Sequence, residues 1–270
     1  MADKEFLELR RKIIEKDFQH MNDKQKQAIF QVKGPVLILA GAGSGKTTVI
    51  VNRIANIVKY GDAYNSKECA FEPSVRDLRS MRAYLDGDES VLFDIEDLLS
   101  VNPARPWQIL AITFTNKAAN ELKERLEKML GEEAKDIWAS TFHSSCVRIL
   151  RRDGEVLGYT KHFTIYDTDD SKRLIKECQR QLNISENTIS YKAIISEISK
   201  AKDNLISPEE YEKKAFGEKD ARMQKIAACY KMYQSELKKS DAMDFDDMIA
   251  NTVKLFKEQP DVLNYYANKF

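Results

Sequence analysis

Three short apolar runs along the chain predict buried β-strands. They are PVLILA (35–40), QILAITF (108–114) and IWAST (137–141), and each is followed by a stretch with apolar residues at helical spacing. A continuous aliphatic run of this length is typical of a strand covered on both faces, as in a parallel sheet. Because strand and helix alternate, the pattern predicts a doubly wound α/β fold.

The helices that follow these strands are expected to pack one apolar face on the sheet. The second has a continuous apolar stripe and ends just before Gly131, a suitable C-cap. The three expected helices span residues 47–60, 116–130 and 144–152.

Two stretches interrupt this alternation. Residues 62–106 are acidic and contain three prolines and short helical patterns such as SVRDLRSMRAYL, so we expect an insertion there. From about residue 167 to residue 239 the pattern is helical throughout, with long polar faces. A change of pattern on this scale predicts a second domain.

The charge balance is neutral overall but uneven along the chain. The 43 basic and 43 acidic residues cancel, which is weak evidence for a nucleic-acid partner. Residues 62–101 hold ten acidic and four basic side chains, a net charge of −6, so the remainder carries +6. A mildly basic body with an acidic insertion is compatible with DNA binding.

Cysteine spacing and hydropathy bear on the compartment. The four cysteines are widely scattered, which argues against a zinc ribbon or a disulfide framework and favours structural thiols in a reducing compartment. No apolar run approaches the ~20 residues of a membrane span, and the charged N-terminus has no secretory apolar region. We therefore expect a cytoplasmic protein without a membrane partner.

The sharpest chemical motif is AGAGSGKTT at 40–48, between the first expected strand and its helix. Its glycines let successive backbone N–H groups point at phosphate oxygens, Lys46 supplies a charge for the β and γ phosphates, and Thr47 offers a hydroxyl to Mg²⁺. The strict pattern opens with glycine, where this loop has Ala40. Lys46 and Thr47 are also the catalytic candidates. The expected phosphate-binding residues are Ala40, Gly41, Ala42, Gly43, Ser44, Gly45, Lys46, Thr47 and Thr48.

A phosphate-loop enzyme also needs an acidic residue at the end of a neighbouring buried strand to hold Mg²⁺. The candidates for this role are weak. Asp244, Asp246 and Asp247 follow a charged KKSD segment, which is no buried strand. Asp94 follows three apolar residues, but the apolar positions around it fit helical spacing better. We therefore expect the catalytic acid to be absent from these 270 residues.

Four further segments carry a resemblance to a known family. Together with the phosphate loop, they are similar in order to the Q motif, motif Ia, motif Ib and a domain re-entry segment of the UvrD/Rep-type superfamily 1 DNA helicases. The segments are MNDKQKQAI (21–29), AITFTNKAANELKERL (111–126), STFHSSCVRILRR (140–152) and MDFDDMI (243–249).

The resemblance implies a fold and a division into domains. The fold is α/β, a P-loop NTPase (RecA-like) parallel sheet flanked by helices, with an all-helical second domain inserted. The ATP-binding domain would comprise residues 1–166 and 240–270, and the helical domain residues 167–239. The acidic insertion at about 62–106 has no counterpart in the family pattern.

The resemblance also assigns roles to individual side chains. Gln25 stands where the family reads the adenine edge, and its amide can both donate and accept. Phe114 ends a strand where an aromatic ring can stack on an unpaired base. The resemblance places His143 beside single-stranded DNA, and a capping or hydrogen-bonded histidine is an equal alternative. The expected DNA contacts are Thr113, Phe114, Thr115, Asn116, Lys117, Thr141, Phe142 and His143.

The implied function is that of a DNA motor. The intact protein would use ATP and Mg²⁺ to alternate two motor domains and step 3′ to 5′ along single-stranded DNA, up to single/double-strand junctions. The Asp-Glu pair and the C-terminal motor domain would follow residue 270, so we expect this chain to bind ATP and single strands without hydrolysis.

Other classes of protein are compatible with the phosphate loop. One is a self-contained small kinase that uses Asp94 as its acid. A second is a regulatory module controlled by ATP, and a third is a structural DNA-binding protein that makes no use of ATP.

Overall fold

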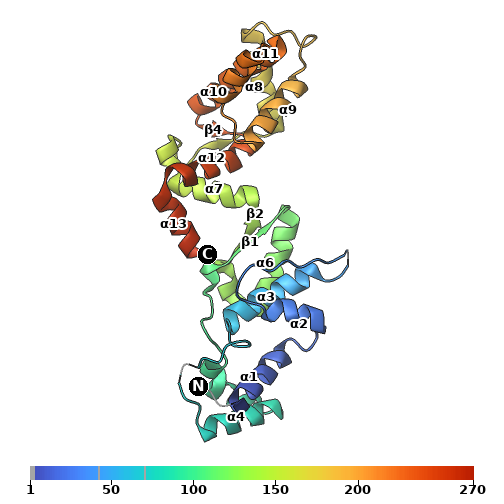
Figure 1. Cartoon of the computed structure of the whole chain (residues 1–270), viewed down its shortest axis with the longest axis vertical. Coiled ribbons are helices and arrows are strands. Elements are labelled where there is room, and N and C mark those ends of the chain that lie inside the picture. Colours follow the sequence, from blue (N-terminus) through green and yellow to red (C-terminus); the bar gives the residue numbers. More distant parts are fainter. Residues whose placement is uncertain (1–3, 42, 70) are drawn as a thin grey trace. The chain divides into compact units, whose positions relative to one another are not determined.

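The computed structural model describes residues 4–41, 43–69 and 71–270. They form two compact units, one reaching to Ser140 and including Phe270, the other comprising Thr141–Lys269 (Figure 1). The domain boundaries expected at 166/167 and 239/240 fall inside the second unit, and that division stays a prediction.

The first unit is mostly helical, with one small sheet. Helices α3 and α6 pack together through Val51 and Ile54 on one side and Leu122 and Leu126 on the other, all buried. Helix α6 has the predicted bounds and the predicted glycine C-cap, Gly131, whose φ is 70°. The elements are α1 (Lys4–Asp17), α2 (Asp23–Phe30), α3 (Lys46–Lys59), α4 (Val75–Leu85), α5 (Leu92–Ile95), β1 (Leu110–Thr113), α6 (Asn116–Leu130) and β2 (Trp138–Thr141), with short 3₁₀ turns between them.

The strand expected at 35–40 does not form, and this prediction is wrong. Leu37 and Leu39 are 83% and 86% exposed, whereas a buried strand was expected. Within the described residues, β1 pairs with β2 in a two-stranded sheet that leaves residues 35–40 out. An apolar run becomes a strand when a neighbour accepts and donates its backbone hydrogen bonds, and here none does. The fold is therefore α/β and mostly helical, with small sheets.

The acidic insertion is folded. Helix α4 forms where a helical pattern was expected, and Ser74 caps it by accepting from the N–H of Asp77. The segment around Asp94 is also helical, as expected, in α5 and two flanking 3₁₀ turns (Glu89–Val91 and Glu96–Leu98).

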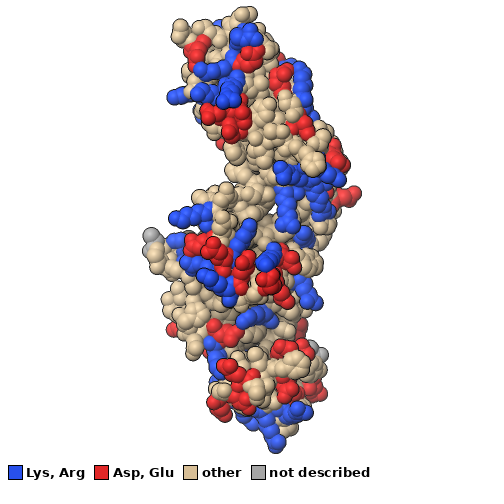
Figure 2. Space-filling model, turned by 180° about the vertical axis from the view of Figure 1, so that it is seen from behind, with Lys and Arg blue, Asp and Glu red and all other residues tan. Residues whose placement is uncertain are grey.

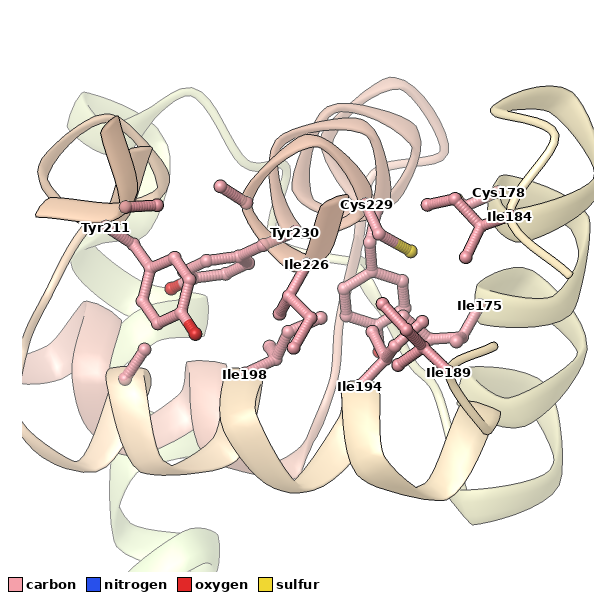
Figure 3. Close-up of a cluster of buried hydrophobic side chains, with 14 of the residues drawn as sticks. Ile175, Cys178, Ile184, Ile189, Ile194, Ile198, Tyr211, Ile226, Cys229 and Tyr230 are labelled. Carbon is pink, nitrogen blue, oxygen red and sulfur yellow. The ribbon is translucent and has the colours of Figure 1, made fainter. Parts of the chain in front are cut away.

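The second unit is built around a helical core. Figure 3 shows isoleucines of α8 and α9 meeting Ile226, Cys229 and Tyr230 of α11. Two short strands run parallel at its base, with Thr164 opposite Ala242. The elements are α7 (Phe142–Asp153), β3 (Thr164–Ile165), α8 (Thr168–Gln181), α9 (Tyr191–Asp203), α10 (Pro208–Gly217), α11 (Ala221–Lys239), β4 (Ala242–Met243), α12 (Phe245–Glu258) and α13 (Pro260–Lys269).

Two further sequence expectations can be compared with the structure. All four cysteines are free, and Cys178 and Cys229 lie buried in the helical core. In the described part of the chain, no helix is both long enough and apolar enough to cross a bilayer.

The exposure of residues 35–40 can be tested by substitution. Leu37→Ser should change the free energy of unfolding by less than about 0.5 kcal/mol, as surface substitutions do. Leu126→Ala, in the buried core, should cost about 2–5 kcal/mol. Tryptophan fluorescence in a urea titration reports on this unit, because Trp107 and Trp138 are the chain's two tryptophans and both lie in it. If Leu37→Ser lowered the free energy of unfolding by several kcal/mol, residues 35–40 would have to be buried, as the sequence predicted.

Candidate nucleotide and DNA sites

The first turn of α3 lacks a side-chain cap. Nine other described helices of eight or more residues begin with a side chain that accepts a hydrogen bond from their backbone N–H groups. At α3 the N-cap is Gly45, which has no side chain to accept. Helix N-terminal N–H groups need partners, and a phosphate oxygen is a suitable one. The N-terminus of α3 is therefore suited to an anion, and it lies at the predicted position.

The loop backbone requires glycine at two points. Gly43 and Gly45 have φ values of 75° and 81°, in the left-handed region that side chains with a Cβ disfavour. A Cβ on Gly45 would also lie 3.2 Å from Nε2 of Gln25. The glycine spacing therefore follows from the loop's curvature, as the sequence predicted. Ala42, also predicted to hold phosphate, lies outside the described residues.

The Lys46 side chain folds back over the loop. Its Nζ donates to the carbonyl oxygens of Ala40 at 3.0 Å and Gly41 at 2.7 Å. Ser44 Oγ donates to the same Gly41 oxygen at 2.7 Å. Lys46 and Thr47 are both exposed. The ammonium group is thus held at the loop by neutral acceptors, which phosphate oxygens can replace with stronger, charge-assisted bonds.

Gln25 lies against the phosphate loop. Its Nε2 donates to the Ser44 carbonyl at 3.3 Å, and its Oε1 accepts from the backbone N–H of Asn22 at 3.1 Å. The second bond belongs to the capping box of α2. Arg53 of α3 donates to the Ala28 carbonyl at 2.6 Å, which ties the end of α2 to α3. The structure therefore joins Gln25, the loop and α3 into one assembly.

The chemistry of these donors fits a nucleotide triphosphate. An uncapped helix N-terminus, a lysine and the Thr47 hydroxyl are the groups that bind phosphate oxygens and Mg²⁺. The described residues place no carboxylate in a hydrogen bond or ion pair with Lys46 or Thr47, and they hold no cluster of three metal-ligating side chains. Asp94 is half-exposed on α5 and lies 3.8 Å from Arg76. The position of Asp94 on a helix, paired with arginine, gives no support to a kinase acid.

The corner between β1 and α6 carries an exposed aromatic ring. Phe114 is 91% exposed, although it follows directly on β1. Thr115 caps α6 by accepting from Ala118 N at 3.2 Å, and the Thr113 hydroxyl donates to the Thr115 carbonyl at 3.1 Å. The threonines therefore shape the corner. Phe114, Asn116 and Lys117 are the exposed groups that it presents.

The corner between β2 and α7 is more enclosed. Thr141 is buried and caps α7 through Ser144 N at 3.2 Å. Phe142 is 44% exposed, and His143 is half-buried. The His143 ring packs edge-on against Phe245 of α12, with centroids 5.9 Å apart. His143 is thus held by packing in this state.

The sequence did not reveal a buried ion cluster that fixes the start of α12. Lys202 Nζ lies 2.6 Å from Asp244 Oδ2 and 2.9 Å from Asp247 Oδ1, and all three residues are buried. Asp244 is also the N-cap of α12, one residue before Phe245. The cluster therefore positions the ring that packs on His143. A lysine continuing the buried positions Ile194 and Ile198 at helical spacing was the available signal.

The ionisation of this cluster follows from its burial. Burial works to lower the pKa of Lys202, but the two carboxylates outweigh it and raise that pKa. Burial and the neighbouring Asp244 raise the pKa of Asp247, against the attraction of Lys202. One ammonium thus faces two carboxylates, and it stabilises their charged forms.

Basic side chains are grouped on part of the second unit. Figure 2 shows Lys and Arg side chains gathered at the height of α7 and α13, with mixed charges elsewhere on the visible face. Two arginines near the end of α7 take part in packing: Arg152 stacks 3.7 Å from the Tyr265 ring centre, and Arg151 lies 5.8 Å from that of Phe163. Packed arginines are weaker evidence for a DNA track than exposed ones.

The uncapped helix behind a glycine-rich loop defines a P-loop protein. The family model of the UvrD/REP helicase N-terminal domain matches residues 21–71 and 91–270, so the chain belongs to that family and the resemblance is confirmed. The ATP-dependent DNA helicase PcrA of Staphylococcus epidermidis is 41% identical over 251 residues, and that of Staphylococcus aureus is 40% identical. Each alignment covers 93% of this chain and 28% of the relative, so the chain spans just over a quarter of their length.

The ion cluster leads to a prediction about stability and pH. Lys202→Met should destabilise the second unit by about 3–5 kcal/mol at neutral pH, because two buried carboxylates lose their counter-ion. Without Lys202 the folded pKa of Asp247, which is already raised, should rise further above its unfolded value. Stability of the variant should then increase as pH falls from 8 to 5, because Asp247 becomes protonated. Circular dichroism in a urea titration measures both effects.

Lys200→Met is the matched control, because Lys200 is 66% exposed and pairs with Glu197 on the same helix. Its cost should stay below about 1 kcal/mol and should not vary in this way with pH. Equal behaviour of the two variants would contradict a structural role for the cluster.

Proposed function

We propose that this chain is the ATP-binding and single-stranded-DNA-binding N-terminal part of an ATP-dependent 3′–5′ DNA helicase. The main observation in support of nucleotide binding is the uncapped N-terminus of α3, which begins with Lys46. The relatives are named as ATP-dependent DNA helicases, which supports the same assignment.

ATP binding would use groups that are already assembled. The triphosphate would take the N–H groups of α3 and the Lys46 ammonium, and Thr47 would hold Mg²⁺ together with the phosphates. Gln25 would exchange its bond to Ser44 for the adenine edge. Lys46 and Gln25 both bond to loop carbonyls in the structure, so each has to release the loop for the nucleotide.

DNA binding would rest on the exposed groups of the β1–α6 corner. Phe114 offers a ring face to an unpaired base, and stacking of this kind tolerates any sequence. Asn116 and Lys117 are exposed beside it and suit a backbone phosphate. Phe142 and His143 form a second contact, which Phe245 supports from behind. Unwinding at single/double-strand junctions would be a property of the whole protein.

Hydrolysis would need groups from elsewhere. We propose that these 270 residues bind ATP without turnover, because no carboxylate bonds to Lys46 or Thr47 in the described chain. A second, C-terminal motor domain would complete the site. We further propose that residues 1–166 and 240–270 form the ATP-binding domain, that residues 167–239 form the helical domain, and that the protein works in the cytoplasm.

Lys46→Ala tests the nucleotide site. Affinity for a fluorescent N-methylanthraniloyl ATP analogue with Mg²⁺ should fall about tenfold to a hundredfold, since a hydrogen bond to a charged group contributes about 1.5–3 kcal/mol. Lys128→Ala, at an exposed position on α6, should bind like the wild type. Phosphate release should be negligible in all three proteins. Unchanged affinity in Lys46→Ala would refute the nucleotide site. ATP hydrolysis by the wild type would refute the proposal that these residues bind ATP without turnover.

Phe114→Ala tests the DNA contact. Affinity for a labelled single-stranded oligonucleotide, measured by fluorescence anisotropy, should fall by about 1–3 kcal/mol, the contribution of one base–aromatic stack. Phe216→Ala is the control, because Phe216 is 59% exposed on α10 and has no proposed role. If both variants bind the oligonucleotide equally well, Phe114 is not a stacking platform.

A further inference from the structure

Two stretches that the family model does not match pack against each other. The match begins at residue 21 and omits residues 72–90, which contain the whole of α4. The N-terminal helix α1 lies in the other unmatched stretch. Glu5 and Arg82 form an ion pair between these helices, and Lys16 Nζ donates to the Tyr84 carbonyl at 3.0 Å. Helices α1 and α4 therefore lie outside the part of the chain that the family model matches, and they are joined to each other.

This addition has a hydrophobic core of its own. Phe6 and Ile13 of α1 meet Met81 of α4, Ile95 of α5 and Leu98 of the following 3₁₀ turn, and all five are fully or almost fully buried. We call residues 4–17 and 62–101 the accessory module. A core of this kind costs chain length and ordering entropy, which a tolerated surface loop does not require.

The module is anchored by a buried arginine. Arg10 is fully buried and donates to the carbonyl oxygens of Glu68 at 2.8 Å and Ser66 at 2.5 Å. Burial lowers its pKa, and nearby Cys69 and Asp62 act in the opposite direction. The start of the insertion is thus fixed to α1, so the module presents a defined surface.

Four apolar side chains on that surface are turned to solvent. Arg76 at the start of α4 lies 3.8 Å from Asp94 of α5, so the residues next to them are neighbours. Val75 and Phe93 are such residues. The apolar patch consists of Val75 (68% exposed), Leu92 (39%) and Phe93 (83%), and Phe71, four residues before Val75, is 50% exposed. Exposed aromatic and aliphatic groups gathered in one place mark interaction sites.

The segment that carries the apolar patch is acidic. Residues 62–101 carry a net charge of −6. A surface of this sign repels nucleic-acid phosphates and anionic lipid headgroups, and it attracts cationic partners. The exposed carboxylates of the module include Glu72, Asp88, Glu89, Glu96 and Asp97.

We propose that the apolar patch and the acidic side chains near it in sequence bind a basic amphipathic segment of a partner protein. The aromatic and aliphatic side chains would supply the desolvated centre, in which a few residues carry most of the binding energy. The carboxylates would select lysine and arginine and raise the association rate.

The test uses the 270-residue chain and a defined probe. The probe is a fluorescein-labelled amphipathic peptide of 14 residues made of leucine and lysine, and its binding is followed by anisotropy. The double variant Phe93→Ser, Val75→Ser should lose at least tenfold in affinity. Phe216→Ser removes an exposed phenylalanine from the other unit and should bind like the wild type. Equal binding by the double variant would overturn the proposal.

A matched pair of charge-reversal variants tests the electrostatic contribution to binding. Glu96→Lys, Asp97→Lys should also lose at least tenfold in affinity, whereas Glu132→Lys, Glu133→Lys changes the net charge equally at exposed sites outside the module and should lose little. Binding should weaken with salt. Equal binding of a leucine–glutamate peptide would overturn the proposal. So would sedimentation showing that the wild type self-associates through Phe93, because the occupant would then be a second copy.

Discussion

The backbone N–H groups at the start of a helix need hydrogen-bond partners, and α3 cannot supply them from its own sequence. Gly45 adopts a left-handed conformation that favours glycine, and glycine has no side chain to act as a cap. Lys46 adds a positive charge at the helix end where cations are unfavourable. Both costs are offset when an anion binds there. The loop that is poorly satisfied by itself is therefore well matched to a phosphate.

Gln25 extends this constraint beyond the loop. The same amide completes the capping box of α2 and bonds to Ser44, so α2 and the loop share one side chain. Arg53 adds a second tie between α2 and α3. A nucleotide that draws Gln25 away from Ser44 would therefore change the support of both helices. This arrangement couples occupancy of the site to the position of α2.

Local patterns were predictable, and interactions between distant segments were not. Helix α6, its glycine cap and the phosphate loop follow from spacing, because neighbours in sequence decide them. The run at 35–40 was misread because strand formation depends on a partner elsewhere. The Lys202 cluster joins Lys202 to aspartates 42 or more positions away, so the pattern of MDFDDMI could not reveal their counter-ion. The packing of α1 on α4 was hidden for the same reason.

The accessory module leaves the family fold intact because its two ends meet. Gly61 and Val101 form a parallel bridge, with Asp62 N donating to Val101 O at 2.8 Å and Val101 N donating to Tyr60 O at 3.0 Å. Gly61 has a φ of 56°, and a Cβ there would collide with the Val101 carbonyl. The chain thus leaves the end of α3 and returns toward β1 at two adjacent points, which the Gly61–Val101 bridge holds together. Closing a loop costs little more as it lengthens, so a folded module can be accommodated at this point without disturbing the phosphate loop at the other end of α3.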